Sequence, residues 1–214
     1  MNKNASPFSL FVQKKYIPAI FRLTRRGRAC IMKRLFVLFR AEVGQKGQEC
    51  MIVLGIDPGY ALMGWGVVEA QGSRMKLLGY GCIETKAGTP MQHRLRTLQL
   101  GIRDLTLMYR PDEVAFEELF FAQNVTTALM VGAARGAAII AAAEYTENLY
   151  EYTPMQIKQA ITGYGKADKK QIQQMVKMLL RMEELPKPDD AADAIACAIT
   201  HCQAGRMREQ FRMK

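Results

Sequence analysis

The order of strand-like and helix-like segments after Met51 constrains the fold of this chain more than any other feature of its sequence. Three short apolar runs, 51–57, 64–69 and 77–85, follow one another with turn residues between them, which predicts an antiparallel meander. Helical and extended patterns then alternate. The expected helices are 90–109, 125–145, 154–161, 168–181 and a last one capped by Asp189 or Asp190, and the expected strands are 112–117 and 149–152. This order predicts an α/β protein with a five-stranded mixed sheet flanked by helices.

Charge is distributed unevenly along the chain, whose formal net charge is +10. Residues 1–50 hold 11 Lys and Arg against 2 Asp and Glu, whereas residues 51–214 hold 19 against 18. The basic character of the whole chain is therefore weak evidence that its folded part binds nucleic acid. We expect a basic extension over 1–50, a folded domain over 51–206 and a basic C-terminal tail over 207–214.

The first fifty residues show no sustained apolar periodicity, and their apolar patches are far shorter than the roughly 18–20 residues of a membrane span. No membrane association is therefore expected. An Arg-rich, acid-poor composition is compatible with an organellar transit peptide or with a basic arm that follows DNA phosphates. We favour a third interpretation, a start-site artefact, because a well-patterned domain begins at Met51 by itself.

Five cysteines are scattered along the chain without a CxxC pair. An odd count with irregular spacing predicts free thiols in a reducing compartment, and hence a cytoplasmic protein. Cys197 and His201 share a helix face, but two residues are a weak metal site. An apolar helix face that packs small side chains is the stronger interpretation of that pair.

Carboxylates end or begin several of the expected elements. Asp57 ends the first strand, Glu117 ends the fourth, and Asp190 and Asp193 open the last helix. Acids gathered in one cleft repel one another and raise one another's pKa unless a cation lies between them. Hard oxygen ligands suit Mg²⁺ or Mn²⁺, and a metal pair about 3.5–4 Å apart is widely used to cleave phosphodiesters. This set of acids favours a metal-dependent nuclease.

Sequence spacing alone leaves two choices open within this set. Glu117 and Glu118 are adjacent, so strand alternation sends them to opposite faces of the sheet and only one can join Asp57. Asp193 shares a helix face with both Asp190 and Asp189, and any of them near the helix start is favoured by the helix dipole. Each acid taken singly is adequately explained as a turn or cap residue.

The segment from Met155 to Arg181 is basic, with six Lys and Arg residues against Asp168 alone. A solvated helix face explains this composition, and a strip that contacts DNA phosphates explains it equally well. Phe120 and Phe121 follow the glutamate pair directly. Aromatic side chains at such a position are often part of a core, although beside a nuclease centre one could stack on bases.

Taken together, residues 51–202 resemble the RuvC family, the bacterial Holliday-junction resolvases of the ribonuclease-H-like superfamily. The resemblance implies a ribonuclease-H-like fold for the α/β domain. It is carried by several motifs in order. They are Ile56-Asp57-Pro58-Gly59, Phe116-Glu117-Glu118-Leu119-Phe120-Phe121, Gly132-Ala133-Ala134-Arg135-Gly136, Gln156-Ile157-Lys158-Gln159, Gly163-Tyr164-Gly165-Lys166-Ala167-Asp168-Lys169 and Asp190-Ala191-Ala192-Asp193-Ala194.

The resemblance also implies roles for single residues. It selects Asp57, Glu117, Asp190 and Asp193 as metal ligands and catalytic acids. It makes Lys158 and Lys169 functional lysines near the scissile phosphate, and it places Phe120 at an aromatic position that contacts bases near the crossover. We count Lys158, Lys166, Lys169, Lys170 and Phe120 as expected DNA contacts. Nothing in the family pattern matches residues 1–50.

The activity that the resemblance implies is that of a homodimeric, Mg²⁺-dependent endonuclease. Such an enzyme binds two Mg²⁺ ions per site, with Mn²⁺ as a substitute. It nicks a four-way DNA junction symmetrically and leaves 5′-phosphate and 3′-hydroxyl ends during recombination and repair. The RuvA–RuvB branch-migration complex is the implied partner.

Two alternatives come from other functional classes. One is an actin-like, phosphate-binding ATPase, which shares an Asp-Gly turn after its first strand but needs a second Gly-rich loop and a longer, duplicated chain. The other is a catalytically inactive junction-binding module, against which the complete set of acids argues.

Overall fold

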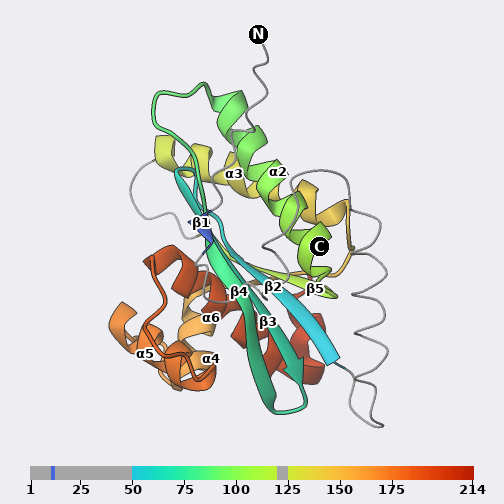
Figure 1. Ribbon diagram of the computed structural model, residues 1–214, viewed down its shortest axis with the longest axis vertical. Coiled ribbons are helices and arrows are strands. Elements are labelled where there is room, and N and C mark those ends of the chain that lie inside the picture. The colour runs from blue at the N-terminus through green and yellow to red at the C-terminus, as the bar shows by residue number, and fades with distance from the viewer. Residues whose placement is uncertain (1–10, 13–49, 120–124) are drawn as a thin grey trace, which may run out of the picture.

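The structure, a computed structural model, describes residues 11–12, 50–119 and 125–214. Its sheet has the strand order β1-β4-β3-β2-β5-β6 (Figure 1). Strands β4, β3 and β2 pair antiparallel, whereas β2, β5 and β6 pair parallel. The strands are β1 (Phe11–Val12), β2 (Cys50–Asp57), β3 (Leu62–Gln71), β4 (Arg74–Glu84), β5 (Glu113–Glu117) and β6 (Leu149–Tyr152). The expected five-stranded mixed sheet is confirmed for β2 to β6.

Both edges of this sheet receive a segment from near a chain end. Phe11–Val12 pairs antiparallel with Gly81 and Cys82 of β4. At the opposite edge, Arg212 forms an antiparallel bridge with Tyr150 of β6. The strand at Phe11–Val12 was not expected from the sequence, because a pair of residues leaves no periodic signature. The remainder of that extension, 1–10 and 13–49, lies outside the described residues, so the division into extension, domain and tail stays a prediction.

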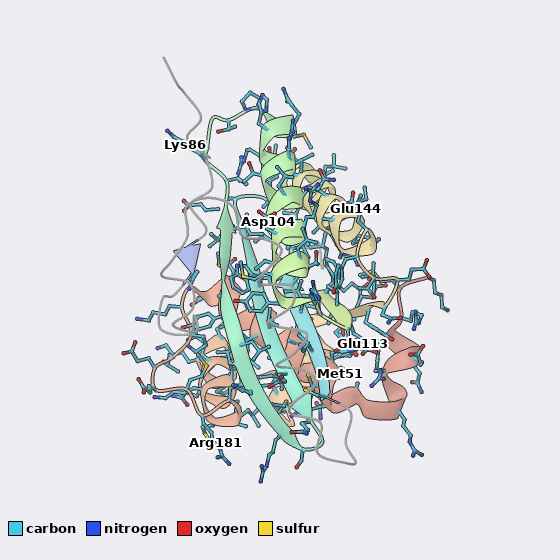
Figure 2. The ribbon with its side chains drawn as sticks, turned by 45° about the vertical axis from the view of Figure 1, so that its right-hand side comes forward. Met51, Lys86, Asp104, Glu113, Glu144 and Arg181 are labelled. Atoms are coloured by element: carbon cyan, nitrogen blue, oxygen red, sulfur yellow. The ribbon has the colours of Figure 1, made fainter. Side chains whose placement is uncertain are left out.

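The helices form two layers, one on each face of the sheet. They are α2 (Met91–Tyr109), α3 (Val125–Ala143), α4 (Pro154–Thr162), α5 (Lys169–Leu179) and α6 (Asp189–Ala204), followed by the 3₁₀ helix η3 (Gly205–Phe211). Figure 1 shows α2 and α3 together on one side and α4, α5 and α6 on the other. Figure 2 shows the same division in side chains, with Asp104 and Glu144 on the first side and Arg181 on the second.

Strand alternation fills both layers. In β2, Val53 packs into the core beneath α6, whereas Leu54 and Ile56 pack into the core beneath α2 and α3. In β5, Ala115 faces α6 and Phe116 faces the other layer. Burial of such apolar surface contributes about 25 cal/mol per Å², so two apolar faces hold helices against both sides of the sheet. The parity of a residue within a strand therefore decides which layer it meets.

Capping explains where α4 and α5 begin. Thr153 and Gln156 form a capping box before α4, and Asp168 and Gln171 form another before α5. In each box, the cap side chain accepts a backbone N–H and the second side chain returns the bond. The second box confirms the expected cap at Asp168. Lys169 consequently stands at the first position of α5.

The expectation that Asp189 or Asp190 caps the last helix is wrong. Pro188 is the N-cap of α6, it makes no side-chain cap hydrogen bond, and both aspartates lie within the first helical turn. Proline is compatible with a helix start because its φ is already close to helical and it has no N–H to satisfy. The helix dipole then stabilises the two carboxylates without a capping bond.

Three glycines allow α6 to lie directly on the centre of the sheet. A Cβ added at Gly64 would stand 1.9 Å from the carbonyl oxygen of Asp190, and one at Gly55 would stand 2.1 Å from that of Ala194. At Gly66, an added Cβ would also collide with α6. Because backbone contacts backbone here, any side chain would lift the helix away from β2 and β3. These glycines therefore set how closely the helix bearing the aspartates approaches the strands.

Candidate metal-dependent active site

Asp57 and Glu117 end neighbouring parallel strands. Ile56 of β2 is in register with Phe116 of β5, so the next residue of each strand, Asp57 or Glu117, follows directly beside the other. Ile56 and Phe116 face the α2–α3 layer, and alternation turns the two acids toward α6. By the same rule Glu118 turns back toward α2 and α3. The choice that sequence spacing left open between the two glutamates is thus supported in favour of Glu117.

The aspartates of α6 approach the strand ends through the glycine contact. The backbone of Asp190 lies against Gly64, which is the register partner of Asp57 in the β2–β3 ladder. Asp189, in contrast, is exposed and accepts a hydrogen bond of 2.8 Å from Nε2 of Gln173 in α5. Asp190 is therefore the residue of this pair that lies beside the strand acids.

The four acids interact electrostatically as one cluster. Burial, followed by the charges of Glu117, Asp193 and Asp190, raises the pKa of Asp57 to about 8. Burial and then the charge of Asp193 raise the pKa of Glu117 to about 7. Burial also raises the pKa of Asp193 above its ordinary value. In the absence of a cation, these carboxyl groups therefore resist full ionisation at neutral pH.

Two of the expected lysines act on this cluster. Nζ of Lys169 lies 3.5 Å from Oδ2 of Asp193, and its charge lowers the pKa of both Asp57 and Glu117. Lys158, half-buried in α4, also lowers the pKa of Glu117. The side chain of Lys169 is 68% exposed, so its ion pair is a weak restraint and the lysine is accessible to a substrate phosphate.

The remaining expected contacts lie at the surface or beyond the described chain. Lys166 precedes α5 and Lys170 is its second residue, and both side chains are exposed. Neither is brought among the acids in the way that Lys169 is. Phe120 lies outside the described residues, as does its neighbour Phe121. The base-contact role of Phe120 therefore stays a prediction.

The donor chemistry of the cluster fits a divalent cation. All four side chains offer hard carboxylate oxygens, which Mg²⁺ and Mn²⁺ prefer, and their repulsion is the kind that such an ion offsets. Within residues 11–12, 50–119 and 125–214, no three His, Cys, Asp or Glu side chains already form a closed coordination group. Binding of a cation would therefore have to draw the carboxylates together.

Two structural contributions to this site were missed in the sequence. The Gly64-x-Gly66 pattern is a readable signal, because glycines two apart in a strand leave one face of it bare. The contact of Arg94 with Thr85 and with the carbonyl of Tyr60 left no such signal. It joins α2 to the turn after Asp57, and a contact between segments so far apart in the chain has no local pattern.

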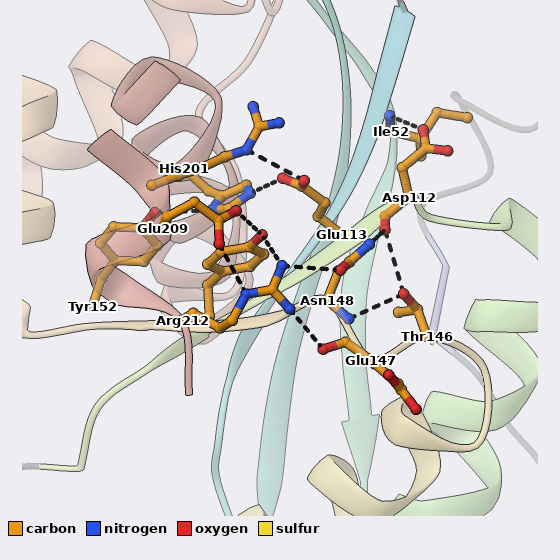
Figure 3. A network of polar contacts seen from close by, with 12 residues as sticks. Ile52, Asp112, Glu113, Thr146, Glu147, Asn148, Tyr152, His201, Glu209 and Arg212 are labelled. Carbon is orange, nitrogen blue, oxygen red and sulfur yellow. Dashed lines mark hydrogen bonds and ion pairs between the residues drawn. The ribbon is translucent and has the colours of Figure 1, made fainter. Parts of the chain in front are cut away.

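The other end of α6 carries a second buried polar cluster, drawn in Figure 3. Nε2 of His201 contacts Oε2 of Glu113, while Nδ1 of His201 lies 2.8 Å from the hydroxyl of Tyr152. Arg208 reaches the second oxygen of Glu113 from η3 at 3.3 Å. His201 is therefore engaged by β5 and β6, and η3 reaches the same glutamate through Arg208. Of the Cys197–His201 pair, Cys197 packs in the apolar core, whereas His201 belongs to this polar cluster.

Known proteins match most of this chain. The family model described as "Crossover junction endodeoxyribonuclease RuvC" matches residues 53–201. A protein of that name from Brevibacillus brevis is 56% identical over 153 residues, which covers 72% of this chain and 92% of the relative. One from Alkaliphilus metalliredigens is 49% identical over 164 residues, covering 77% and 100%. Among solved structures, T. thermophilus RuvC in complex with Holliday junction substrate matches with a TM-score of 0.70 and 38% identity, over 73% of this chain and 96% of that one. The chain therefore belongs to the RuvC family of crossover junction endodeoxyribonucleases.

Proposed function

We propose that this chain is a metal-dependent endonuclease that resolves four-way DNA junctions by paired, symmetric nicks. The observation that carries the proposal is the convergence of Asp57, Glu117, Asp190 and Asp193 at one end of the sheet. Membership of the RuvC family supports the substrate, since the Thermus thermophilus relative was solved with a Holliday junction. Nicks with 5′-phosphate and 3′-hydroxyl ends can be resealed by a ligase, which suits recombination and repair.

We infer that the four acids hold a pair of Mg²⁺ ions, with Mn²⁺ as a substitute. When bound, such ions activate the attacking water and stabilise the departing 3′ oxygen. The chain's own contribution would be to hold these half-buried carboxylates of β2, β5 and α6 close together as ligands. The raised pKa of Asp57 supports this inference, because a bound cation favours the ionised carboxylate that burial and its neighbours disfavour.

We propose that the basic side chains next to the acids contact the phosphates of the DNA. Lys169 and Lys158 would face the scissile phosphate and offset the negative charge that grows on it in the transition state. Lys166 and Lys170, which are exposed at the start of α5, would hold flanking phosphates. For Phe120 we propose a contact with bases at the crossover, worth about 1–3 kcal/mol if the ring stacks.

The outer face of α3 supports the proposed homodimer. Val125, Leu129 and Ile140 are exposed, and Gly132 and Gly136 complete one stripe along the helix with open space where a side chain would be. A glycine inside a helix costs roughly 0.5–1 kcal/mol relative to alanine, so two of them need a reason. Close approach of the same helix from a second copy supplies one. Two active sites related by a two-fold axis would then match a junction that is itself close to two-fold symmetric.

Among the described residues, α3 is long and apolar enough to cross a membrane, but length and composition alone are weak evidence for a membrane span. Its alanines Ala134, Ala138, Ala141 and Ala142 are buried in the core beneath it.

The dimer assignment is tested by comparing two substitutions in α3. Leu129→Glu changes a residue on the exposed stripe, and Met130→Glu changes its exposed neighbour off the stripe. The first change should give a monomer in sedimentation analysis and the second should not. Dimers from both variants would reject the α3 contact.

Two further expectations accompany the proposed activity. A partnership with the RuvA–RuvB branch-migration complex rests on the family resemblance. A cytoplasmic location is supported by the free thiols of Cys82, Cys197 and Cys202. Co-purification of the full chain with RuvA–RuvB on a junction would test the first.

The decisive experiment is cleavage of a synthetic four-way junction by the purified full chain. We expect two nicks at symmetric positions in strands of like polarity, dependent on added Mg²⁺ and absent in EDTA. Ligase treatment should restore full-length strands if the ends are 5′-phosphate and 3′-hydroxyl. Junction binding without cleavage under any divalent cation would reject the nuclease and favour an inactive binding module.

A further inference from the structure

The turn that follows Asp57 is held from outside the strand ladder. The carbonyl of Tyr60 accepts a hydrogen bond of 2.7 Å from Oγ1 of Thr85 and one of 3.3 Å from Nη2 of Arg94. Nε of Arg94 donates to the same threonine oxygen at 2.8 Å. The guanidinium carbon of Arg94 also lies 3.8 Å from the centre of the Tyr60 ring. The Arg94 side chain thus contacts both the carbonyl and the aromatic ring of Tyr60, and it also contacts Thr85, which binds the same carbonyl.

This turn has little slack between the arginine and the catalytic acid. A Cβ at Gly59 would stand 1.8 Å from the carbonyl oxygen of Leu62, so the chain closes on itself within a few residues. Thr85 fastens the far side, since its N–H donates to the carbonyl of Ala61 at 2.9 Å. Asp57 is the last residue of β2, immediately before the turn. A shift of the turn therefore reaches Asp57 over only two intervening residues.

We propose that Arg94 is a positioning residue, which holds the turn so that the Asp57 carboxylate is oriented for a divalent cation. The inference rests on the proposed function, because it gives Asp57 a metal to bind. Mg²⁺ demands near-ideal octahedral geometry, so a small misorientation of one ligand weakens binding. Residues that orient metal ligands typically change metal affinity by about 10–100-fold when they are removed.

Charge and position make opposite predictions for the loss of Arg94. Removing a cation from the neighbourhood of an acidic site should, by Coulomb's law alone, tighten the binding of a divalent cation. Loss of positioning should weaken it. A residue that only supports the fold would lower stability without changing the affinity of the folded protein for metal. The sign of the change in metal affinity therefore separates the three roles.

The test is a calorimetric titration of Mn²⁺ into the full chain without DNA. We expect Arg94→Ala to bind Mn²⁺ about 10-fold more weakly than the wild type, with Arg94→Lys in between. Arg96→Ala is the matched control, since Arg96 is exposed on the same helix and should leave the affinity unchanged. In junction cleavage, the deficit of Arg94→Ala should be larger in Mg²⁺ than in Mn²⁺, which binds such sites more tightly.

Thr85→Val provides a second route to the same answer should Arg94→Ala fail to fold. It removes the hydroxyl that links Arg94 to the Tyr60 carbonyl but keeps the arginine, and it should weaken Mn²⁺ binding in the same direction. Unchanged or tighter Mn²⁺ binding in a folded variant would overturn the positioning role. Failure of the wild-type protein to cleave a junction while it still binds Mn²⁺ would instead count against the proposed function alone.

Discussion

Acidic side chains lie against the sheet at both ends of helix α6, half-buried at its start and buried at its end, and their negative charge is compensated differently at the two ends. At its start, Asp193 joins the strand acids and pairs with the largely exposed Lys169. At its end, the carboxylate of Glu113 contacts His201 and Arg208 (Figure 3). One acidic cluster is left with an excess of negative charge, whereas the Glu113 carboxylate is paired with the Arg208 guanidinium and contacts the His201 ring. The difference marks the first as a place for an added cation and the second as part of the framework.

The two ends are also linked by their spacing. Asp193 and His201 are separated by eight residues of helix, which span about 12 Å. Glu117 and Glu113 are separated by four residues of strand, which span about 13 Å. Because the helix runs opposite to β5, a contact at the Glu113 end keeps α6 in a register that brings its aspartates to Glu117. The balanced cluster of Glu113, His201 and Arg208 thereby supports the unbalanced cluster of Asp57, Glu117, Asp190 and Asp193.

The largest expected effect is that of neutralising one acid in the unbalanced cluster. Asp57→Asn should lower the cleavage rate by more than about 100-fold, because it removes a charged metal ligand, while junction binding is largely kept. Glu117→Gln, Asp190→Asn and Asp193→Asn should behave alike. Single-turnover cleavage and a gel-shift assay in Ca²⁺ measure the two quantities separately.

The control for that experiment is Asp104→Asn, an exposed acid on the opposite face of the protein (Figure 2). It should cleave at the wild-type rate. A cleavage rate of Asp57→Asn near that of the wild type would mean that the excess charge at this end of α6 has no catalytic role, and the comparison of the two ends would fail.

At the balanced end, the effect should fall on stability instead of catalysis. His201→Ala removes a fully buried ring that contacts Glu113 and Tyr152, so it leaves a cavity and unpaired buried groups and should lower the free energy of unfolding by about 3 kcal/mol. Urea unfolding measures this loss. Cleavage per folded molecule should stay close to that of the wild type, because the close contacts at Gly55, Gly64 and Gly66 still hold α6 against the strands. A large loss of cleavage with normal stability would reverse the roles assigned to the two ends.

The pH dependence of stability should also reveal the unbalanced cluster. The pKa of Asp57 rises from 3.8 in the unfolded chain to about 8 in the metal-free fold. A carboxyl group with a raised pKa stabilises the fold at low pH, and that contribution is lost as the pH rises toward the folded value. The melting temperature in EDTA should therefore fall between about pH 4 and pH 8, the interval between the unfolded and the folded pKa of Asp57. Asp57→Asn should flatten this slope, and an equally steep slope in that variant would contradict the assignment.

Much of the fold was predictable because local sequence patterns determine where its strands and helices begin and end. A continuous apolar run predicted β2, the alternation of Val114 and Phe116 predicted β5, and the capping signal at Asp168 predicted the start of α5. Strand alternation showed that only one of Glu117 and Glu118 can lie beside Asp57, but it did not select which one. What spacing could not supply was the approach of α6 to the strand ends, since it depends on glycine contacts between segments far apart in the chain. The family resemblance filled that gap by selecting Asp190 and Asp193 together.

Other features were beyond reach for the same physical reason. The contact between His201 and Glu113 joins residues 88 positions apart, and no local sequence pattern predicts it. The N-cap at Pro188 was missed because the neighbouring aspartates are stronger cap formers in isolation. Tertiary contacts decide such positions, and they override the local preference on which sequence patterns depend.

A smaller effect should distinguish the two ends of the basic segment. Lys169→Ala removes a cation that lowers the pKa of Asp57 and Glu117, so the acidic limb of the pH–rate profile should move to higher pH. Lys177→Ala, in the last turn of α5, should leave that limb in place and reduce only the salt dependence of junction binding, by about one unit of slope. Identical profiles for both variants would return the segment to a solvated helix face.

The smallest expected effect is that of Glu118→Gln, which tests the geometry of β5 most finely. Glu118 follows Glu117 directly, and its N–H donates to the carbonyl of Tyr152 at 2.8 Å, so the strand pairing continues through it. Alternation therefore directs its side chain away from α6, and its charge should matter little to a metal on the other face. Cleavage by Glu118→Gln should stay within about threefold of the wild type, the scale of a 0.7 kcal/mol change. If Glu118→Gln were inactive while Glu117→Gln cleaved normally, the strand would present the opposite face to α6, and the acidic end of the helix would need a different set of partners.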